Sequence, residues 1–253
     1  MTRLLHTANQ WREMRKQLPG RTIGFVPTMG ALHQGHMALI QRAQTDNDVT
    51  VVSIFVNPTQ FNDKTDYQRY PRNDERDMEL LTSQGVDFVF MPSVEELYPD
   101  KYSIRISESE ISNIMEGRSR PGHFDGVLTV VMKLLGIIRP HRSYFGEKDY
   151  QQYLLIKKMA EAFFLETQII PCATVRDSDG VALSSRNVLL GPEERLKAAR
   201  FPQILATAPT ADDAAAQLQQ EGFTVDYVCD TWGRRFGAVR LGGIRLIDNM
   251  VMA

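Results

Sequence analysis

The chain has 253 residues, of which 43% are hydrophobic and 24% are charged, and its formal net charge is −2. Such a balance is typical of a soluble globular protein and gives no general electrostatic attraction to nucleic acid or to an acidic membrane. The sequence has neither the roughly 18 apolar residues of a membrane span nor the uninterrupted apolar core of a signal peptide, so we expect a cytoplasmic protein.

Short β-rich runs alternate with helical stretches in the first part of the chain. The pattern predicts strands at Thr22–Pro27, Val49–Val56 and Val86–Pro92, and helices at His36–Thr45 and Asn73–Gln84. The strands are apolar rather than half polar, which is typical of a parallel sheet covered by helices on both faces. We therefore expect a Rossmann-like, doubly wound α/β domain over residues 1–174, with ligands at the carboxyl ends of its strands.

The first of these strands runs into a glycine-rich turn, "FVPTMGALHQGH" (Phe25–His36), that ends in two histidines. Its last two glycines have the spacing of a phosphate-binding P-loop, but His36 stands where that motif requires Lys followed by Ser or Thr. His33 and His36 lie at the opening of a helix, where backbone N–H groups and the helix dipole favour an anion. A structural role and a metal pair remain open, although a metal pair needs nearby carboxylate or further His ligands that the sequence lacks.

The loop after the second strand, "NPTQF", offers two amide side chains. Gln60 follows the strand and two turn-forming residues, so we expect it to face the same crevice as the two histidines. Asn57 stands at the carboxyl end of the strand, and the same argument applies to it. The alternative is that both are ordinary polar residues of a surface loop.

The pattern is less regular between Ile104 and Gly126, where "GRSRPGHFDG" (Gly117–Gly126) is interpreted as a basic, glycine-rich loop. A clear helix follows this loop and ends before Pro140. Its core-facing stripe is expected at three- and four-residue steps, at Val127, Val130, Val131, Leu134, Leu135 and Ile138.

A third turn after a short run, "FGEKD" (Phe145–Asp149), places Lys148 where it could meet a phosphate. The alternative is that Lys148 pairs with Glu147 or Asp149 on the surface. The next helix is expected to bury a stripe made of Gln152, Leu155, Ile156, Met159 and Phe163. Because a buried amide needs a hydrogen-bond partner, Gln152 is interpreted as a contact to a ligand.

The segment "ALSSRN" (Ala182–Asn187) supplies two hydroxyls and an arginine, and an arginine can bind two phosphate oxygens at once. A serine-rich turn that caps a helix is the alternative. One such signal decides nothing. Four sets of donors suited to anions, at strand ends and loops of one chain, point toward a nucleotide.

Residues 175–253 are expected to form a small α+β domain. Its elements are a helix at Pro192–Ala199, a loop and capped helix within Thr207–Leu218, and short runs at Phe223–Val228, Ala238–Gly243 and Ile244–Asp248. The two cysteines of the chain, Cys172 and Cys229, lack the paired spacing of a zinc site, and we expect buried, reduced thiols.

Seven motifs together resemble the pantothenate synthetases, the family of ATP-dependent pantoate–β-alanine ligases. They are "PTMGALHQGH", "SIFVNPTQF", "YPR", "RPGHFDGV", "FGEKDYQQ", "DGVALSSRN" and "RLIDN", and the resemblance runs from about Arg21 to Val251. "HQGH" is similar to the HIGH signature of a wider nucleotidyltransferase superfamily, and "SSR" resembles its mobile KMSKS phosphate loop.

The resemblance implies a two-step reaction. Pantoate attacks the α-phosphorus of ATP to give pantoyl adenylate and pyrophosphate, and β-alanine then attacks the acyl carbon and releases AMP. Mg²⁺ accompanies ATP, and no protein side chains are expected to form a metal site. The implied partners are these small molecules, with no nucleic acid and no membrane, and the implied assembly is a homodimer.

The resemblance also implies a role for each matching residue. The ATP site would comprise Pro27, Thr28, Met29, Gly30, Ala31, Leu32, His33, Gln34, Gly35, His36, Gly146, Glu147, Lys148, Asp149, Val175, Leu183, Ser184, Ser185 and Arg186. Within it, the catalytic residues would be His36, His33, Lys148, Ser184 and Arg186. Pantoate and β-alanine would be bound by Asn57, Gln60 and Gln152.

Two features concern closure of the site. Water must be kept from an acyl adenylate, and the segments expected to close over it are Asp63–Tyr70 or Gly117–Gly122. The chain also looks shorter than is usual in the family after "EERLKAAR", which puts the size of the C-terminal lid in question. The alternatives are a related nucleotidyltransferase with a phosphorylated acceptor, which would favour Arg or Lys over the two glutamines, and a nucleotide sensor that has lost catalysis.

Overall fold

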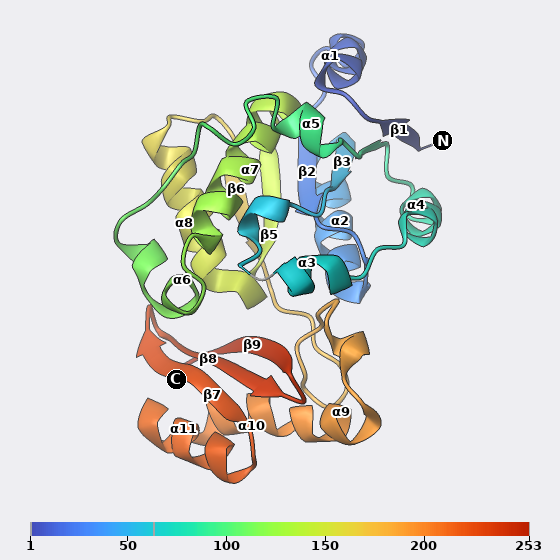
Figure 1. The fold of residues 1–253 in the computed structure, drawn as a ribbon. Helices are drawn as coiled ribbons and strands as arrows, with labels where there is room; N and C mark the ends of the chain where they lie inside the picture. Colours follow the sequence, from blue (N-terminus) through green and yellow to red (C-terminus); the bar gives the residue numbers. More distant parts are fainter. Residues whose placement is uncertain (1, 63, 253) are drawn as a thin grey trace. The chain divides into compact units, whose positions relative to one another are not determined.

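Six strands form one parallel sheet within residues 2–62 and 64–252, the part of the chain that the computed structural model describes. Their order across the sheet is β1–β4–β3–β2–β5–β6 (Figure 1). The strands are β1 (Arg3–Leu5), β2 (Ile23–Thr28), β3 (Val49–Ile54), β4 (Phe88–Phe90), β5 (Arg142–Gly146) and β6 (Gln168–Cys172). The predicted Rossmann-like fold class is confirmed.

The order of the strands locates the expected ligand-binding edge. From β2 the chain continues to β3 on one side, and β5 pairs with β2 on the other side. The carboxyl end of β2 is therefore flanked by those of β3 and β5, which is the topological switch point where ligands bind in open parallel sheets. The loops after these three strands carry the histidine turn, "NPTQF" and "FGEKD".

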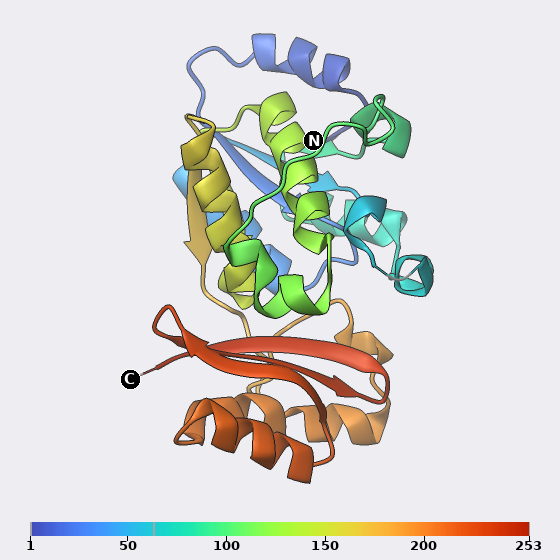
Figure 2. The same cartoon turned by 60° about the vertical axis from the view of Figure 1, so that its left-hand side comes forward.

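Helices cover both faces of this sheet (Figures 1 and 2). They are α1 (Ala8–Lys16), α2 (Gln34–Asp46), α3 (Lys64–Arg69), α4 (Asp74–Ser83), α5 (Val94–Leu97), α6 (Met115–Ser119), α7 (His123–Ile138) and α8 (Tyr150–Ala162), with 3-10 turns η1 (Pro58–Gln60), η2 (Ile111–Asn113) and η3 (Glu147–Asp149). On one face, Met37 and Ile40 of α2 and Leu81 of α4 form a cluster with Val26 and Val52 of the sheet. On the other, α7 packs on β2.

Most of the predicted elements occur within a residue or two of the expected bounds, and three expectations about burial or loops are wrong. Gly117–Gly126 is mostly helical, because α6 and α7 occupy all of it except the short turn Arg120–Gly122. Phe163 lies beyond the end of α8 and is 54% exposed, so it does not extend the buried stripe. Both cysteines are free thiols, but Cys172 and Cys229 are only half-buried.

The glycines explain the error in the supposed loop. A Cβ on Gly117 would lie 1.7 Å from the carbonyl oxygen of Ser112, and a Cβ on Gly126 would lie 2.5 Å from that of Thr59. These glycines allow helices to approach neighbouring backbone, whereas Gly122, with φ +79°, starts α7 in a left-handed conformation. Of the expected closing segment Asp63–Tyr70, Asp63 lies outside the described residues, and α3 occupies most of the rest.

The described chain divides into two compact units. The first comprises Met1–Leu32, His36–Gly146 and Gln151–Cys172, and the second comprises His33–Gly35, Glu147–Tyr150 and Ala173–Ala253. The second unit contains η4 (Asn187–Leu189), α9 (Pro192–Ala198), α10 (Arg200–Thr207), α11 (Ala211–Gln220), β7 (Thr224–Thr231), β8 (Arg234–Leu241) and β9 (Ile244–Val251).

Three of the described strands form an antiparallel sheet in the second unit, in the order β7–β8–β9. Two-residue turns join them, at Trp232–Gly233 and Gly242–Gly243, and all four residues have positive φ, as tight hairpins require. The hairpins extend the short predicted runs to eight residues each. Phe201, Ile204 and Leu205 of α10, a helix that the sequence pattern did not predict, and Leu218 of α11 share a core cluster with this sheet.

Candidate active site

The turn after β2 is held by a buried carboxylate. Asp77 of α4 is 2% exposed, and its two oxygens accept the backbone N–H groups of Ala31 and Leu32 at 2.7 and 2.9 Å. A Cβ on Gly30, which has φ +75°, would lie 2.9 Å from the same carboxylate. The Thr28 hydroxyl donates to the Ser53 carbonyl and accepts the N–H of Gly30. The "TMGAL" turn is therefore fixed by the first unit's own side chains.

These hydrogen bonds limit which backbone N–H groups of the turn can bind a phosphate. Two of its backbone N–H groups already bind an anion, Asp77, so a phosphate cannot take the same donors without displacing it. Burial raises the pKa of Asp77, against the two backbone hydrogen bonds, which lower it. The sequence predicted the helix that carries Asp77, but nothing in a one-dimensional pattern indicated that this carboxyl contacts the turn.

The two histidines of the turn have different surroundings. His36 lies in the first turn of α2 and is half-buried. His33 precedes the helix, and its Nδ1 accepts the backbone N–H of Gly35 at 3.1 Å, one of the N–H groups that a helix start leaves without an internal partner. Burial and the nearby Lys148 lower the pKa of His33 to about 4. The ring is therefore neutral near pH 7, and its proton lies on Nε2, which can donate.

Gln60 is brought into the site by a chain of amide hydrogen bonds at the carboxyl end of β3. It is 9% exposed, its Oε1 accepts from Asn57 Nδ2 at 3.1 Å, and its Nε2 donates to Met29 Sδ at 3.1 Å. Asn57 is 1% exposed, and its second amide proton goes to the Gly126 carbonyl. Tyr98, a residue that the sequence did not single out, donates from its hydroxyl to Asn57 Oδ1 at 2.8 Å.

Asn57 makes internal hydrogen bonds with both of its amide protons and with its carbonyl oxygen, and it thereby orients Gln60. A contact between Asn57 and a ligand stays a prediction. Gln60 differs, because among the described residues its Nε2–H group reaches only the thioether sulfur of Met29, which is a weak acceptor. A substrate oxygen is a better partner for that N–H group than the sulfur of Met29.

A second set of side chains forms hydrogen bonds to the backbone carbonyl of Gln60. The Gln60 carbonyl accepts from His123 Nδ1 at 2.9 Å and from Arg120 at 3.3 Å. Arg120 also lies 3.1 Å from His123 Nε2, and because a guanidinium can only donate, Nε2 must accept and Nδ1 must carry the proton. Arg120 in turn pairs with Glu116 at 3.7 Å. These residues come from the segment that the sequence analysis interpreted as a loop.

The helix α8 presents two neighbouring glutamines, and the sequence pattern assigned burial to only one of them. Gln151 is 4% exposed, and its amide is taken up by the backbone of Ile111, Ile114 and Glu116. Gln152 is half-buried, and its side chain has no hydrogen bond to another residue that the structure describes. Gln151 therefore anchors α6, while the amide of Gln152 is available to a ligand.

In the "GEKD" turn, Glu147–Asp149 form η3 and belong to the second unit, whereas Gly146 belongs to the first. The Lys148 ammonium lies 3.8 Å from Asp149, one of the two partners that the alternative named, but the Lys148 side chain is only 18% exposed and does not lie on the open surface. Glu147 is paired elsewhere, with Arg234 at 3.0 Å. A cation this loosely paired remains able to meet an incoming phosphate.

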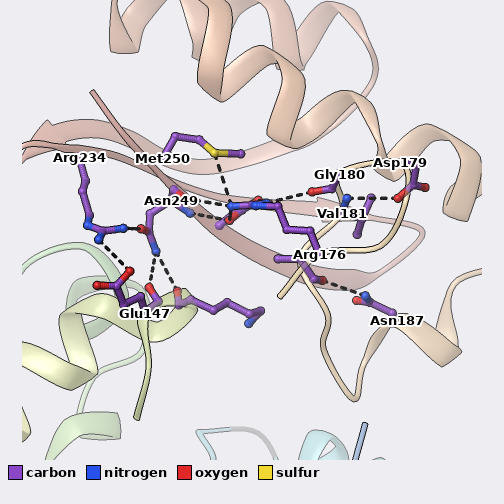
Figure 3. Close-up of polar contacts among 12 residues, drawn as sticks. Glu147, Arg176, Asp179, Gly180, Val181, Asn187, Arg234, Asn249 and Met250 are labelled. Atoms are coloured by element: carbon purple, nitrogen blue, oxygen red, sulfur yellow. Dashed lines mark hydrogen bonds and ion pairs between the residues drawn. The ribbon is translucent and has the colours of Figure 1, made fainter. Parts of the chain in front are cut away.

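The "ALSSRN" segment is shaped by short-range hydrogen bonds in the same unit. Leu183 N–H donates to the Val175 carbonyl at 3.0 Å, and Arg186 N–H donates to the Ser184 hydroxyl at 3.3 Å. Asn187 closes the turn by donating to the Ala182 carbonyl at 3.0 Å (Figure 3). A hydroxyl that accepts one hydrogen bond still has a proton to donate, so Ser184 can serve an anion as predicted.

The predicted site residues are distributed over both units. The first unit holds Pro27–Leu32, His36, Asn57, Gln60, Gly146 and Gln152, and the second holds 33–35, 147–149, Val175 and 183–186. Among the described residues, no three or more His, Cys, Asp or Glu side chains form a group able to hold a metal ion. None of the described helices is long and apolar enough to span a membrane.

The sequence profile of one protein family, described as pantoate-beta-alanine ligase, matches residues 3–251. The chain belongs to this family. It is 50% identical over 250 residues to the pantothenate synthetase of Bdellovibrio bacteriovorus and 49% identical over 253 residues to that of Coxiella burnetii. The alignments cover 99% and 100% of this chain, and 99% and 98% of those proteins.

Solved structures agree with this assignment. The pantoate-beta-alanine ligase from Francisella tularensis, complexed with beta-gamma ATP and beta-alanine, is similar with a TM-score of 0.95 and 44% identity, over 99% of this chain and 98% of that one. The pantothenate synthetase from Thermus thermophilus is similar with a TM-score of 0.91 and 40% identity, over 98% and 99%. The chain is thus a ligase of pantothenate biosynthesis that joins pantoate to β-alanine.

Proposed function

We propose that the ligase works through a pantoyl adenylate. A carboxylate oxygen of pantoate attacks the α-phosphorus of ATP, the bond from that phosphorus to the β-phosphate oxygen breaks, and pyrophosphate leaves. The amine nitrogen of β-alanine then attacks the acyl carbon, loses a proton and displaces AMP. Nucleotidyl transfer needs little covalent help from a protein, so alignment and fixed donors supply most of the acceleration.

The hydrogen bonds and the burial of Gln60 are the observation that carries this proposal. Its amide is buried, it is oriented by Asn57 at 3.1 Å, and its Nε2–H group points at the sulfur of Met29, a partner that a substrate oxygen can replace. We assign pantoate binding to Gln60 and Gln152. Pantoate brings its own carboxylate nucleophile, and neutral amides orient a carboxylate without repelling it.

The phosphates are assigned to donors from the other motifs. His36 in the first turn of α2 and the neutral Nε2–H group of His33 are proposed to bind the phosphate oxygens, together with Lys148, Ser184 and Arg186. These groups stabilise charge as it moves from the α-phosphorus to pyrophosphate. The remaining ATP contacts are proposed at the other predicted residues of the three segments, while Ala31 and Leu32 use their N–H groups on Asp77.

Further parts of the proposal concern the metal, the assembly and the domains. Nucleotide phosphates bind Mg²⁺ directly, so we propose that Mg²⁺ enters with ATP. We also propose a cytoplasmic homodimer, with residues 1–174 as the nucleotide- and pantoate-binding domain and residues 175–253 as the lid domain.

A panel of acceptors tests the proposed chemistry. AMP formation is measured with ATP and with pantoate or other 2-hydroxy acids, each with β-alanine or other amines. We expect AMP to exceed the amount of enzyme only when pantoate and β-alanine are both present. Turnover with a phosphorylated acceptor, and none with pantoate, would show that the enzyme is a different nucleotidyltransferase.

Two substitutions test the assigned donors. His36→Ala and Lys148→Ala are each expected to lower kcat by on the order of a hundredfold or more, the usual cost of removing a donor to the transition state. Circular dichroism and unfolding curves check that the variants are folded. Wild-type kinetics in either variant would remove that residue from the mechanism.

A further inference from the structure

The motif "RLIDN" ends in two polar residues that are buried in the last strand. Asp248 and Asn249 of β9 are each 3% exposed, and β9 is paired with β8 from Ile244 to Val251. Buried polar side chains cost free energy unless they are hydrogen bonded, so their partners indicate what they are for. The chemistry proposed above assigns no role to either residue.

Asn249 binds the main chain of the Lys148 turn (Figure 3). Its Nδ2 donates to the carbonyl oxygens of Glu147 and Lys148, at 2.8 and 3.1 Å, so both amide protons go to consecutive peptide groups. Its Oδ1 accepts from Arg234 at 2.9 Å, and Arg234 also pairs with the Glu147 carboxylate at 3.0 Å. The amide thus fixes the backbone on both sides of the Lys148 Cα, the point from which the ammonium is carried.

Asp248 binds the base of the "ALSSRN" segment. Its carboxylate pairs with the two terminal nitrogens of Arg176, at 2.6 and 2.9 Å, in a bidentate arrangement. Arg176 also donates to the Gly180 carbonyl at 2.9 Å, and its backbone pairs with Ala182 in an antiparallel bridge (Figure 3). Arg176, which precedes the segment that presents Ser184 and Arg186, is therefore held by both its side chain and its backbone.

We propose that Asp248 and Asn249 are positioning residues of the ligase. Both lie on β9, and they hold the Lys148 turn and the "ALSSRN" segment in fixed positions relative to that strand. Adjacent residues of a paired strand keep a fixed separation, so the two phosphate-binding segments are held in one frame. This inference rests on the phosphate-binding roles assigned to Lys148 and to Ser184–Arg186. Neither Asp248 nor Asn249 is assigned a contact with a substrate.

Two replacements of Asn249 separate positioning from packing. Asn249→Ala removes the donor, and Asn249→Asp keeps the shape but points a carboxylate oxygen at two carbonyl oxygens. Asp226→Asn is the control, since Asp226 pairs with Arg240 and Arg245 on the same sheet. Pyrophosphate release with ATP and pantoate is measured alongside thermal unfolding of each variant.

We expect kcat/KM for ATP to fall about 10- to 100-fold in Asn249→Ala, because small displacements of a catalytic group have costs of this size. In Asn249→Asp, kcat/KM for ATP should be lower still, because a carboxylate oxygen faces the carbonyl oxygens of Glu147 and Lys148. The other carboxylate oxygen can keep the contact with Arg234 in the folded protein. Asp226→Asn should stay within about twofold of wild type. If Asn249 matters only for packing, the isosteric Asn249→Asp would be the more active of the two variants, and that order would overturn the proposal. Should Asn249→Ala fail to fold, Asn249→Asp carries the test alone, and wild-type activity in it would overturn the proposal.

Double variants show through which group each residue acts. In a Lys148→Ala background, Asn249→Ala should change kcat/KM by less than about twofold, and in an Arg186→Ala background the same should hold for Asp248→Asn. Full, multiplicative losses in both backgrounds would refute the positioning role. A wild-type rate in Lys148→Ala alone would instead refute the phosphate role of Lys148, whereas a slow Lys148→Ala with active Asn249 variants would refute the inference only.

Discussion

The contact between α7 and the "NPTQ" turn can be tested with one methyl group. In Gly126→Ala, the new Cβ would lie 2.5 Å from the carbonyl oxygen of Thr59 and 2.7 Å from the backbone nitrogen of Gln60. Both are backbone atoms, so no flexible side chain can move aside. Separations below 3.0 Å do not occur at real Cβ atoms, and an ordinary contact needs at least 3.4 Å. The helix and the turn must therefore move apart by about 0.9 Å.

The expected cost follows from this displacement. Overpacking costs about 1–3 kcal/mol, and the better helix propensity of alanine returns about 0.5–1 kcal/mol, so we expect a net loss of up to about 2.5 kcal/mol in the free energy of unfolding. The same movement stretches the 3.1 Å hydrogen bond from Asn57 to the Gly126 carbonyl and shifts Gln60. We expect kcat/KM for pantoate to fall by about 10- to 100-fold.

Gly136→Ala is the matched control, because it makes the same substitution in the same helix with nothing within 4 Å of the new Cβ. It should raise the free energy of unfolding by about 0.5–1 kcal/mol and leave the kinetics unchanged. Urea unfolding and initial rates at varied pantoate concentration measure both quantities. If the two variants were equally stable and equally active, the argument that Gly126 is required by close backbone approach would be refuted.

Three further outcomes are expected. Because burial raises the pKa of Asp77, the stability that this carboxyl contributes is present below its ordinary pKa and lost as the pH rises through the raised one. In Asp77→Asn, an Nδ2–H group faces one of the two backbone N–H groups that the carboxylate accepts, so the unfolding free energy at pH 7 should fall by about 1–3 kcal/mol and kcat/KM for ATP about tenfold; unchanged stability would contradict this. The pKa of His33 is lowered to about 4, so its contribution to stability, about 1–3 kcal/mol after solvent screening, is present above pH 6.5 and lost as the pH falls through 4; an NMR titration midpoint of 6 or more would contradict the lowered pKa. Gln60→Glu places a carboxylate against pantoate and should raise KM for pantoate at least about tenfold with KM for ATP nearly unchanged, whereas parallel changes in both constants would argue against direct contact.

Patterns along the chain predicted the elements that have an apolar pattern, capping residues or turn glycines of their own. β3 is buried at all six positions, including Thr50 and Ser53, which matches its largely apolar composition. Thr210 caps α11 by accepting the N–H of Asp213, as the expected capped helix requires, and Asn73, expected as the first residue of a helix, caps α4 by accepting the N–H of Arg76. The turn after β2 was located because an apolar run met glycines.

Contacts that depend on tertiary approach were not predictable in this way. Gly117 and Gly126 have the composition of a loop, and only the neighbouring backbone reveals that they permit helix packing. Helix α8 shows the same limit, since the predicted stripe is buried at Leu155, Ile156 and Met159, but the buried amide at its start is Gln151 and Gln152 is only half-buried. Asp77 is a further case, because it meets the turn from 45 residues away along the chain.

The site motifs were found because they combine unusual residue types at strand ends, yet their supports were missed. Tyr98, His123 and Arg120 brace Asn57 and Gln60 through hydrogen bonds that no local pattern encodes. A sequence can therefore indicate the groups that meet a ligand, while the groups that hold them emerge only in the folded chain.

Isotope exchange is the most direct test of the proposed adenylate. The purified enzyme is incubated with ATP, Mg²⁺, labelled pyrophosphate and pantoate, without β-alanine, and incorporation of label into ATP is measured. An adenylate formed before the amine enters predicts exchange that depends on pantoate. Absence of exchange from an enzyme that makes pantothenate once β-alanine is added would contradict the account.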